Sequence, residues 1–434
     1  MSAELARQRY LRRHMEPGLP ASPRSKAWRN VLVVPAYREA ARWLERLQAL
    51  PQNAGNTLVI LVLNRPDSDP DDNANRALRQ AIGGLAGSGP GLKVLNPGAE
   101  LYLHDIDLVS GPIPKAQGVG LARKIGCDIA FKWQCEGAID SHWICSTDAD
   151  ARLPPDYFLR LGRAPARAAA AVYPFWHTPA TDPACNLATA LYELRLHHYV
   201  LGLEYADSPY ACHTLGSCLA VTFDAYAQVR GMPRRAGAED FYLLNKLAKV
   251  APVTRLAGEC IALASRESAR VPFGTGPAVA KISAALHPHE LPLFDNPACF
   301  AALRSLLCAL PALHRTAVPD LTGALLETGL EPALAHTASA VLDRMGITQA
   351  LAHCRRQGKT PAQFERHFHQ WFDAFRSLKF SHGLRDAGWP LRSFAQLAAA
   401  PPAFWPAATA DPDQLRSAIA RRWGWTPTGV SDWL

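Results

Sequence analysis

The 434-residue sequence lacks the patterns that mark several large classes of protein. Its ten cysteines include no C-x-x-C pair, and their irregular spacing is typical of reduced, buried thiols rather than of a disulfide framework. No apolar stretch approaches the roughly 18 residues that a membrane span requires. We therefore expect a cytoplasmic protein without a transmembrane segment.

The signatures of several enzyme classes are also missing. There is no Walker loop, no G-x-S-x-G nucleophile elbow, no catalytic cysteine motif and no H-E-x-x-H zinc motif. The run GVGLAR at 118–123 lacks the third glycine of a dinucleotide fingerprint, which leaves Arg123 as a candidate contact for a phosphate. No RNA- or DNA-binding module is recognisable, so we expect no nucleic-acid partner.

Positive charge is in excess in this chain. The net charge of +8 and the pI of about 9.0 suit an anionic ligand or an anionic membrane surface without selecting between them. Residues 1–27 are rich in arginine but have no apolar core, so they are not a secretory signal. We expect a frayed, solvated arm there. The alternative is a peripheral contact with lipid headgroups at the inner face of the membrane.

Continuous apolar runs alternate with helical segments over the first 150 residues. Strands are expected within 30–40, 56–70, 92–97 and 142–150, with helices after the first two and over 114–134. Apolar runs without alternation mark strands buried on both faces, and their alternation with helices marks a parallel sheet. The sequence therefore predicts an α/β protein with a doubly wound, mostly parallel, Rossmann-like sheet.

The rest of the chain is mixed. A long helix is expected over 184–206 and another over 237–251, and beyond about 285 the sequence is helical with frequent prolines. We therefore divide the chain into a basic arm (1–27), an α/β domain (28–284) and a mainly helical C-terminal extension (285–434) of unknown role.

Polar side chains gather where three of the expected strands end. They lie in the segments Tyr37–Glu39, Asn64–Asp72 and Asp148–Asp150. Because the carboxyl ends of parallel strands share one edge of a sheet, a ligand site is expected there. Asp148 and Asp150 can hold Mg²⁺ or Mn²⁺ on two phosphates, although on their own they are equally compatible with a solvent-facing turn.

Two further charged clusters invite both a functional and a structural interpretation. Glu239 and Asp240 open an expected helix, where the helix dipole favours acids, but a carboxylate there can also serve as general base. Arg266 and Arg270 lie in a loop with glycines, where they either clamp a diphosphate or are ordinary surface residues.

Four stretches, taken in order, resemble the family 2 glycosyltransferases, the inverting nucleotide-sugar enzymes of GT-A fold. They are VVPAYRE, GLARKIGCDIAF, STDAD and VRGMPRRAGAEDFYLLNKL, within roughly residues 28–280. The resemblance implies a GT-A-like fold and a hexosyltransferase-type enzyme. Such an enzyme moves a sugar from a nucleotide-diphosphate donor to an acceptor hydroxyl, with Mn²⁺ or Mg²⁺ on the diphosphate.

The resemblance also implies a nucleotide pocket. Pro35, Tyr37 and Glu39 would line it, with Tyr37 near the base. The second strand does not end in the Asp-Asp of the family, so recognition of the base falls to Asn64 or Asp67.

Metal and base follow from the same resemblance. Asp148 would contact the ribose or the metal, Asp150 would hold the metal, and Asp240 would deprotonate the acceptor with Glu239 beside it. A histidine such as His287 or His289 is a weaker candidate for a third ligand.

Two departures from the family pattern, Arg38 after the tyrosine and Met232 after the glycine, put the nucleotide in doubt rather than the reaction. Two other functions stay open. One is a non-catalytic sugar-nucleotide-binding protein, and the other is a sugar-phosphate nucleotidyltransferase, although PAYREA lacks the glycine-rich loop which that chemistry needs. The acceptor, whether glycan, lipid or small molecule, cannot be identified from the sequence.

Overall fold

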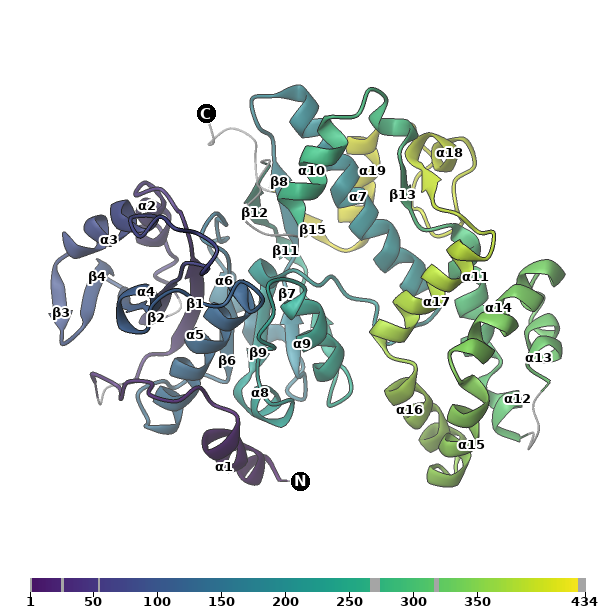
Figure 1. Cartoon of the computed structure of the whole chain (residues 1–434), viewed down its shortest axis with the longest axis horizontal. Helices are drawn as coiled ribbons and strands as arrows, with labels where there is room; N and C mark the ends of the chain where they lie inside the picture. Colours follow the sequence, from purple (N-terminus) through teal and green to yellow (C-terminus); the bar gives the residue numbers. More distant parts are fainter. Residues whose placement is uncertain (1, 25–26, 54, 266–273, 316–319, 428–434) are drawn as a thin grey trace. The chain divides into compact units, whose positions relative to one another are not determined.

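The computed structural model describes residues 2–24, 27–53, 55–265, 274–315 and 320–427. The chain divides into two compact units, and each takes more than one stretch of the sequence (Figure 1). Unit 1 comprises Met1–Thr181, Thr214–Pro277 and Trp423–Leu434, and unit 2 comprises Asp182–His213 and Ala278–Arg422.

Unit 1 is built on a nine-stranded sheet of order β10-β7-β9-β6-β1-β2-β5-β4-β3. Its strands are β1 (Asn30–Ala36), β2 (Thr57–Leu63), β3 (Gly87–Gly89), β4 (Leu92–Asn96), β5 (Ala99–Asp105), β6 (Trp143–Ser146), β7 (Ala170–Val172), β9 (Leu219–Thr222) and β10 (Val253–Arg255). In this sheet β4 and β9 run opposite to the other strands. The predicted α/β class with a mostly parallel sheet is confirmed, and the arrangement is consistent with a GT-A-like fold.

Unit 1 also contains helices. They are α1 (Ala3–Arg13), α2 (Trp43–Gln48), α3 (Arg76–Gly83), α4 (Ile106–Val109), α5 (Gly118–Cys135), α6 (Tyr157–Arg160), α8 (Phe223–Gln228) and α9 (Glu239–Leu247), with 3₁₀ turns η1 (Leu161–Arg163) and η2 (Gly216–Cys218). The central helix α5 packs on β1 and β2. Because β2 is fully buried, the sheet is covered on both sides there, and the long apolar face of α5 covers one of them.

Two small parallel ribbons complete unit 1. β8 (Phe175–Thr178) pairs with β12 (Ile261–Ala264), and β11 (Gly258–Glu259) pairs with β15 (Trp425–Thr426). The second pairing joins residues far apart in the sequence, because β15 follows nearly all of unit 2 in the chain.

Two segments differ from the sequence-based expectation. β5 was not expected, because its side chains alternate between buried and half-buried positions and include polar residues. The N-terminal arm is not frayed, since its first residues form α1, and the burial of Tyr10 against unit 1 holds that helix in place.

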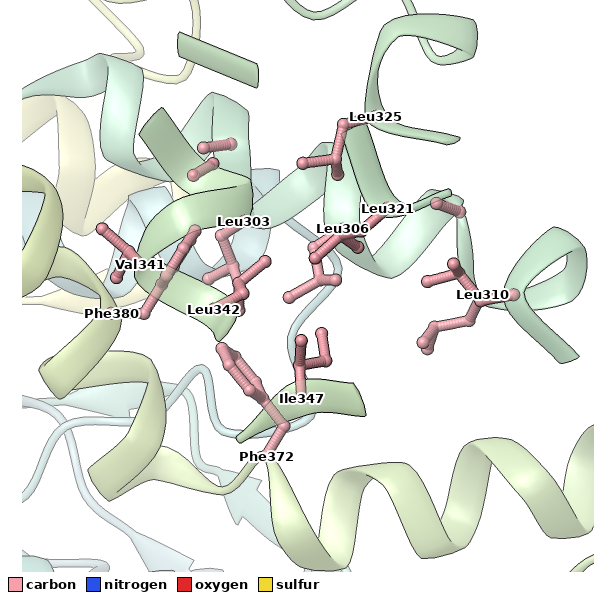
Figure 2. Packing of buried hydrophobic residues seen from close by; sticks show 14 of the residues in the cluster. Leu303, Leu306, Leu310, Leu321, Leu325, Val341, Leu342, Ile347, Phe372 and Phe380 are labelled. Atoms are coloured by element: carbon pink, nitrogen blue, oxygen red, sulfur yellow. The ribbon is translucent and has the colours of Figure 1, made fainter. Parts of the chain in front are cut away.

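Unit 2 is mainly helical. Its elements are α7 (Pro183–Tyr205), most of α10 (Thr275–Ser283), η3 (Pro288–Glu290), β13 (Pro292–Phe294), α11 (Pro297–Cys308), α12 (Leu310–Arg315), α13 (Leu321–Glu327), α14 (Pro332–Arg344), α15 (Ile347–Gln357), α16 (Pro361–Trp371), α17 (Ala374–Asp386), β14 (Arg392–Ser393), α18 (Phe394–Ala399) and α19 (Pro412–Arg422). Figure 2 shows part of its core, where leucines such as Leu303 and Leu342 meet Phe372 and Phe380. Burial of such side chains from several helices stabilises a helical unit.

Among the helices of the described residues, none combines the length and the apolar character that crossing a bilayer demands.

Candidate functional site

The carboxyl ends of three neighbouring strands bring the predicted site residues to one edge of the sheet in unit 1. β1 pairs in parallel with β2, as in Ala36 opposite Leu63, and with β6, as in Val33 opposite Ser146. The segments after these strands carry Tyr37, Asn64 and Asp148. They therefore leave the sheet at the same edge, as expected for a ligand site in such a fold.

Arg123 on α5 is the centre of this site. Its guanidinium donates to Glu239 Oε1 at 2.9 Å, to Ser146 Oγ at 2.8 Å and to the carbonyl oxygen of Gly216 at 2.9 Å, and it also donates to Asp148. The side chain is 4% exposed, so these partners replace the water that a buried cation loses. Arg123 thus links the acidic strand end to the acids of α9.

Two features of the backbone make this link geometrically feasible. A Cβ atom at Gly120 would lie 2.5 Å from the carbonyl oxygen of Arg235, so the glycine lets α5 approach the segment that leads into α9. The Gly120 amide donates to that same oxygen at 3.0 Å. Because β9 runs antiparallel to β6, the preceding turn η2 with Gly216 also lies at the carboxyl end of β6. The GVGLAR run is therefore a close-packing element.

Asp240 is the acid of this cluster whose proton affinity departs most from normal. Burial, and then the charge of Glu239, raise the pKa of Asp240 to about 7, against the opposing charge of Arg123. The backbone amides of Phe241, at 2.7 Å, and of Gly216 donate to its carboxylate. Glu239 is 4% exposed and engaged by Arg123, whereas Asp240 keeps partial exposure. Asp240 is therefore the group suited to exchange a proton near neutral pH.

Asp148 and Asp150 are differently placed. Asp148 pairs with Arg123 but keeps 41% of its side chain exposed, and the backbone carbonyl of Asp150 accepts a bond from Arg46 at 2.7 Å. Across the described residues, no group of three or more His, Cys, Asp or Glu side chains is positioned to hold a metal ion. Two carboxylates nevertheless fit a Mg²⁺-type ion whose other ligands come from substrate phosphates.

A buried hydroxyl directly before Asp148 supports that fit. Thr147 is 3% exposed, and its Oγ1 has no hydrogen-bond partner among the residues that the structure describes. Buried polar atoms are normally paired with protein, water or ligand. The neighbourhood of Asp148 is therefore suited to a polar ligand.

A second charged cluster lies after β1. The Tyr37 hydroxyl donates to Asp69 at 2.6 Å, and Arg38 binds both oxygens of Asp69, at 2.9 and 2.8 Å. Hydrogen bonds from Arg38, and then from Tyr37, hold the pKa of Asp69 well below its usual range. Arg38 itself adopts a left-handed backbone conformation (φ 53°), which is uncommon for a residue other than glycine. Tyr37 is thus fixed by its neighbours.

The other expected nucleotide contacts occupy varied positions. Pro35 is buried within β1, opposite Val62, and Glu39 is half-buried in the following turn. Asn64 is buried and donates to the carbonyl oxygen of Ala36 at 3.1 Å. Asp67 is exposed, and its carboxylate accepts a bond from the Lys115 amide at 2.9 Å.

Arg266 and Arg270 lie outside the described residues.

Sequence analysis missed several members of the site. Asp69 belongs to the Asp-rich loop already singled out, but nothing in the sequence distinguishes it from its acidic neighbours. Ser146 and Gly216 carry no recognisable signal, since the first is an ordinary strand residue and the second contributes through its backbone.

No family model matches the chain, and no curated protein matches it significantly. Among solved structures, the mannosyltransferase PcManGT from Pyrobaculum calidifontis, in complex with GDP-Man and Mn²⁺, is similar over 96% of this chain and 94% of its own. The identity is 16% and the TM-score 0.36.

Proposed function

We propose that the chain is an inverting glycosyltransferase of the family 2 type. It moves a hexosyl group from a nucleotide-diphosphate sugar to an acceptor hydroxyl. The observation that carries this proposal is the arrangement of the acids around Arg123 at one edge of the sheet. Asp240 titrates near neutral pH, and Arg123 joins its neighbour Glu239 to the acidic strand end at Asp148.

Asp240 acts as the general base. It accepts the proton of the acceptor hydroxyl as the new bond to the anomeric carbon forms and the bond to the diphosphate oxygen breaks. A base whose pKa lies near the working pH combines a useful ionised fraction with real affinity for the proton. The hydroxyl attacks opposite the nucleotide diphosphate, which departs with the electron pair of the broken bond, so the configuration at that carbon inverts.

Glu239 and Arg123 position the base. Arg123 holds Glu239 by a hydrogen bond of 2.9 Å, and the negative charge of Glu239 helps to raise the pKa of Asp240. The ion pair also fixes the first turn of α9, on which Asp240 is carried. Glu239 therefore tunes the base without itself accepting the proton.

Asp150 and Asp148 would hold the divalent cation, Mn²⁺ or Mg²⁺. When bound, the ion would neutralise charge on the departing diphosphate. The carboxylate of Asp148 is shared with Arg123, so Asp150 carries the larger part of the ligand role. This division follows from charge, because a metal and a guanidinium compete for the same oxygen.

The donor nucleotide would lie along Pro35, Tyr37 and Glu39, with Asn64 or Asp67 near the base. Tyr37 is held against Asp69, which gives the base a fixed aromatic wall.

Arg266 and Arg270 remain candidates for the diphosphate.

We further propose residues 28–284 as the glycosyltransferase domain. The enzyme would work in the cytoplasm or at the inner face of the membrane.

A binding and turnover experiment tests the proposal. Calorimetry with UDP-, GDP- and other nucleotide sugars, with and without Mn²⁺, should identify one metal-dependent donor, and a donor-hydrolysis assay should show its turnover. Asp150→Ala should abolish the metal dependence of binding, whereas Asp140→Asn, at an exposed acid before β6, should keep it. Binding without any turnover would identify a non-catalytic sugar-nucleotide-binding protein instead.

A further inference from the structure

The N-terminal helix α1 is fixed to unit 1 by one of its faces. Ala6 and Tyr10 are 1% and 0% exposed, and Lys124 donates to the Tyr10 hydroxyl at 2.9 Å. The Tyr10 hydroxyl donates in turn to the buried carboxylate of Asp128. Arg7 on the flank of the helix pairs with Asp224 at 3.0 Å. Cations that face the protein thus have partners, and the helix is held rigidly.

A neighbouring face of α1 carries arginines that point to solvent. Leu5, Arg9, Arg12 and Arg13 line a surface hollow of about 400 Å³. All four side chains are exposed, Leu5 by 51%. Over the described part of the chain, no ion pair engages the three arginines, and Arg12 bonds only to the carbonyl oxygen of Gln8. A rigid helix therefore presents three uncompensated positive charges.

Arg230 extends this positive face. Both Arg230 and Gly231 have left-handed backbones (φ 67° and 73°), and a Cβ at Gly231 would lie 2.3 Å from the Tyr10 hydroxyl oxygen. The turn is therefore seated directly on α1. Burial, and then the charges of Arg230 and Arg9, lower the pKa of His14, which is consistent with both arginines lying near that side chain.

We propose that Leu5, Arg9, Arg12 and Arg13, extended by Arg230, form a docking surface for an anionic lipid bilayer. This docking surface is independent of the proposed transfer reaction. Its three helix arginines, Arg9 to Arg13, lie within about 6 Å along the axis of α1, since the axial rise is about 1.5 Å per residue. They can meet several lipid phosphates at once, and charge complementarity supplies most of the attraction.

The lining of the hollow favours a bilayer over other anions. Described lining residues include no aromatic ring on which a nucleic-acid base would stack. The exposed Leu5 at one end provides an apolar side chain, which gains by entering the boundary between headgroups and acyl chains. The arginine stems can lie along that boundary while their heads remain at the phosphates.

Vesicle flotation with the full chain tests the docking surface. One set of vesicles holds equal parts of phosphatidylglycerol and phosphatidylcholine, and the other holds phosphatidylcholine alone. The variant R9Q/R12Q/R13Q is compared with R29Q/R163Q/R167Q, which removes the same charge from exposed positions elsewhere in unit 1. Thermal melting of both variants checks that α1 stays folded.

We expect the protein to float only with the anionic vesicles and to be released by salt. Each arginine near the surface contributes about fivefold to binding, so R9Q/R12Q/R13Q should bind on the order of 100-fold more weakly. The control variant should bind like the original protein, and Leu5→Ala should lose about twofold to fivefold.

Three outcomes would overturn the docking surface. The first is equal loss in both triple variants, which would mean unspecific attraction by net charge. The second is binding to inorganic phosphate or a soluble acidic polymer without binding to the anionic vesicles. The third is unchanged flotation of R9Q/R12Q/R13Q. Donor turnover measured on the same samples separates this result from the proposed enzymatic function, because neither triple variant alters the site at Asp240.

Discussion

Two buried arginines, one in each unit, hold glutamates in different ways. In unit 2, Arg416 binds both oxygens of Glu193, at 2.9 and 3.0 Å, and both side chains are nearly inaccessible. In unit 1, Arg123 is divided between Glu239 and Asp148, and Asp240 lies beside the same cluster. In the first arrangement one guanidinium faces both oxygens of a single buried carboxylate, whereas in the second it is divided between two acids with a third beside them.

This difference shows what a cluster requires when one guanidinium is divided among several acids. A bidentate Arg–Glu pair satisfies both charges and needs nothing further. The surplus negative charge around Arg123 must be met by a proton or by a cation from a ligand. The raised pKa of Asp240 is the first response, and a metal at Asp148 and Asp150 would be the second. Unit 1 therefore carries the cluster that can change state.

The largest effect is expected from Asp240→Asn, which removes the group that changes state. Transfer should fall by about 10²- to 10⁴-fold with donor binding unchanged, because a general base contributes about that much. Steady-state kinetics and donor calorimetry measure the two quantities. Asp413→Asn, at an exposed acid beside Arg416, is the control and should leave transfer unchanged. Normal turnover by Asp240→Asn would falsify the assignment of the base.

The same variant should gain stability in one pH window. The folded pKa of Asp240 is about 7 against an ordinary 3.8, so the folded state binds the proton more tightly. Its contribution is therefore complete below 3.8 and is lost as the pH rises through about 7. Asn cannot ionise, so Asp240→Asn should melt at a higher temperature than the original protein above pH 7 and at an equal temperature in acid. Equal melting curves throughout would contradict the raised pKa.

Alanine at the two arginines should separate the clusters by stability. Arg416→Ala removes the guanidinium that binds both oxygens of the buried Glu193, which should cost about 3–5 kcal/mol of unfolding free energy in urea titrations. Arg123→Ala should cost less, about 1–3 kcal/mol, because Asp148 can hydrate through its exposed side. Transfer should nevertheless fail only in Arg123→Ala. The reverse order of costs would break the comparison.

A substitution at Gly120 tests the same comparison through the backbone. Gly120→Ala places a methyl group 2.5 Å from a carbonyl oxygen, so α5 must withdraw from the segment before α9. We expect a loss of about 1–3 kcal/mol in stability and a reduced kcat, because Arg123 moves with the helix. Gly162→Ala, where a Cβ meets no atom within 4 Å, is the matched control and should stay within about 1 kcal/mol.

The smallest effect is a shift in the pH profile. Because the charge of Glu239 helps to raise the pKa of Asp240, Glu239→Gln should lower the pH at which transfer reaches half its maximum. The original protein should reach that point near pH 7, since the base must be ionised to act. A profile of kcat/KM against pH measures both values. An unchanged midpoint would mean that burial alone sets the pKa.

Local patterns made much of this fold predictable from the sequence. β1 and β2 are continuous apolar runs, and this pattern predicts strands that are buried on both faces. β5 was not predicted because its sequence AELYLHD mixes polar and apolar residues. This mixture is typical of a strand whose side chains are incompletely buried. The helix α1 was not predicted either, because its strongly basic composition suggested a solvated arm. A few buried contacts around Tyr10 are enough to hold it in place.

The site itself was harder to predict, because its links are long-range. Arg123 and Glu239 are 116 residues apart, and their meeting depends on the close approach at Gly120 and on the antiparallel direction of β9. Neither is visible as a pattern along the chain. Motif order could suggest which acids matter, but not that a buried arginine connects them.

The return of the chain to unit 1 through β15 sets a limit on when that unit can finish folding during synthesis. Gly258 pairs with Trp425, which is 4% exposed and packs against Phe175. The residues of β15 leave the ribosome only after those of unit 2. Until then, β11 of the nascent unit 1 lacks the strand with which it pairs. Chains that stop before Trp425 should therefore be prone to aggregate, even though they contain Asp240 and the whole large sheet.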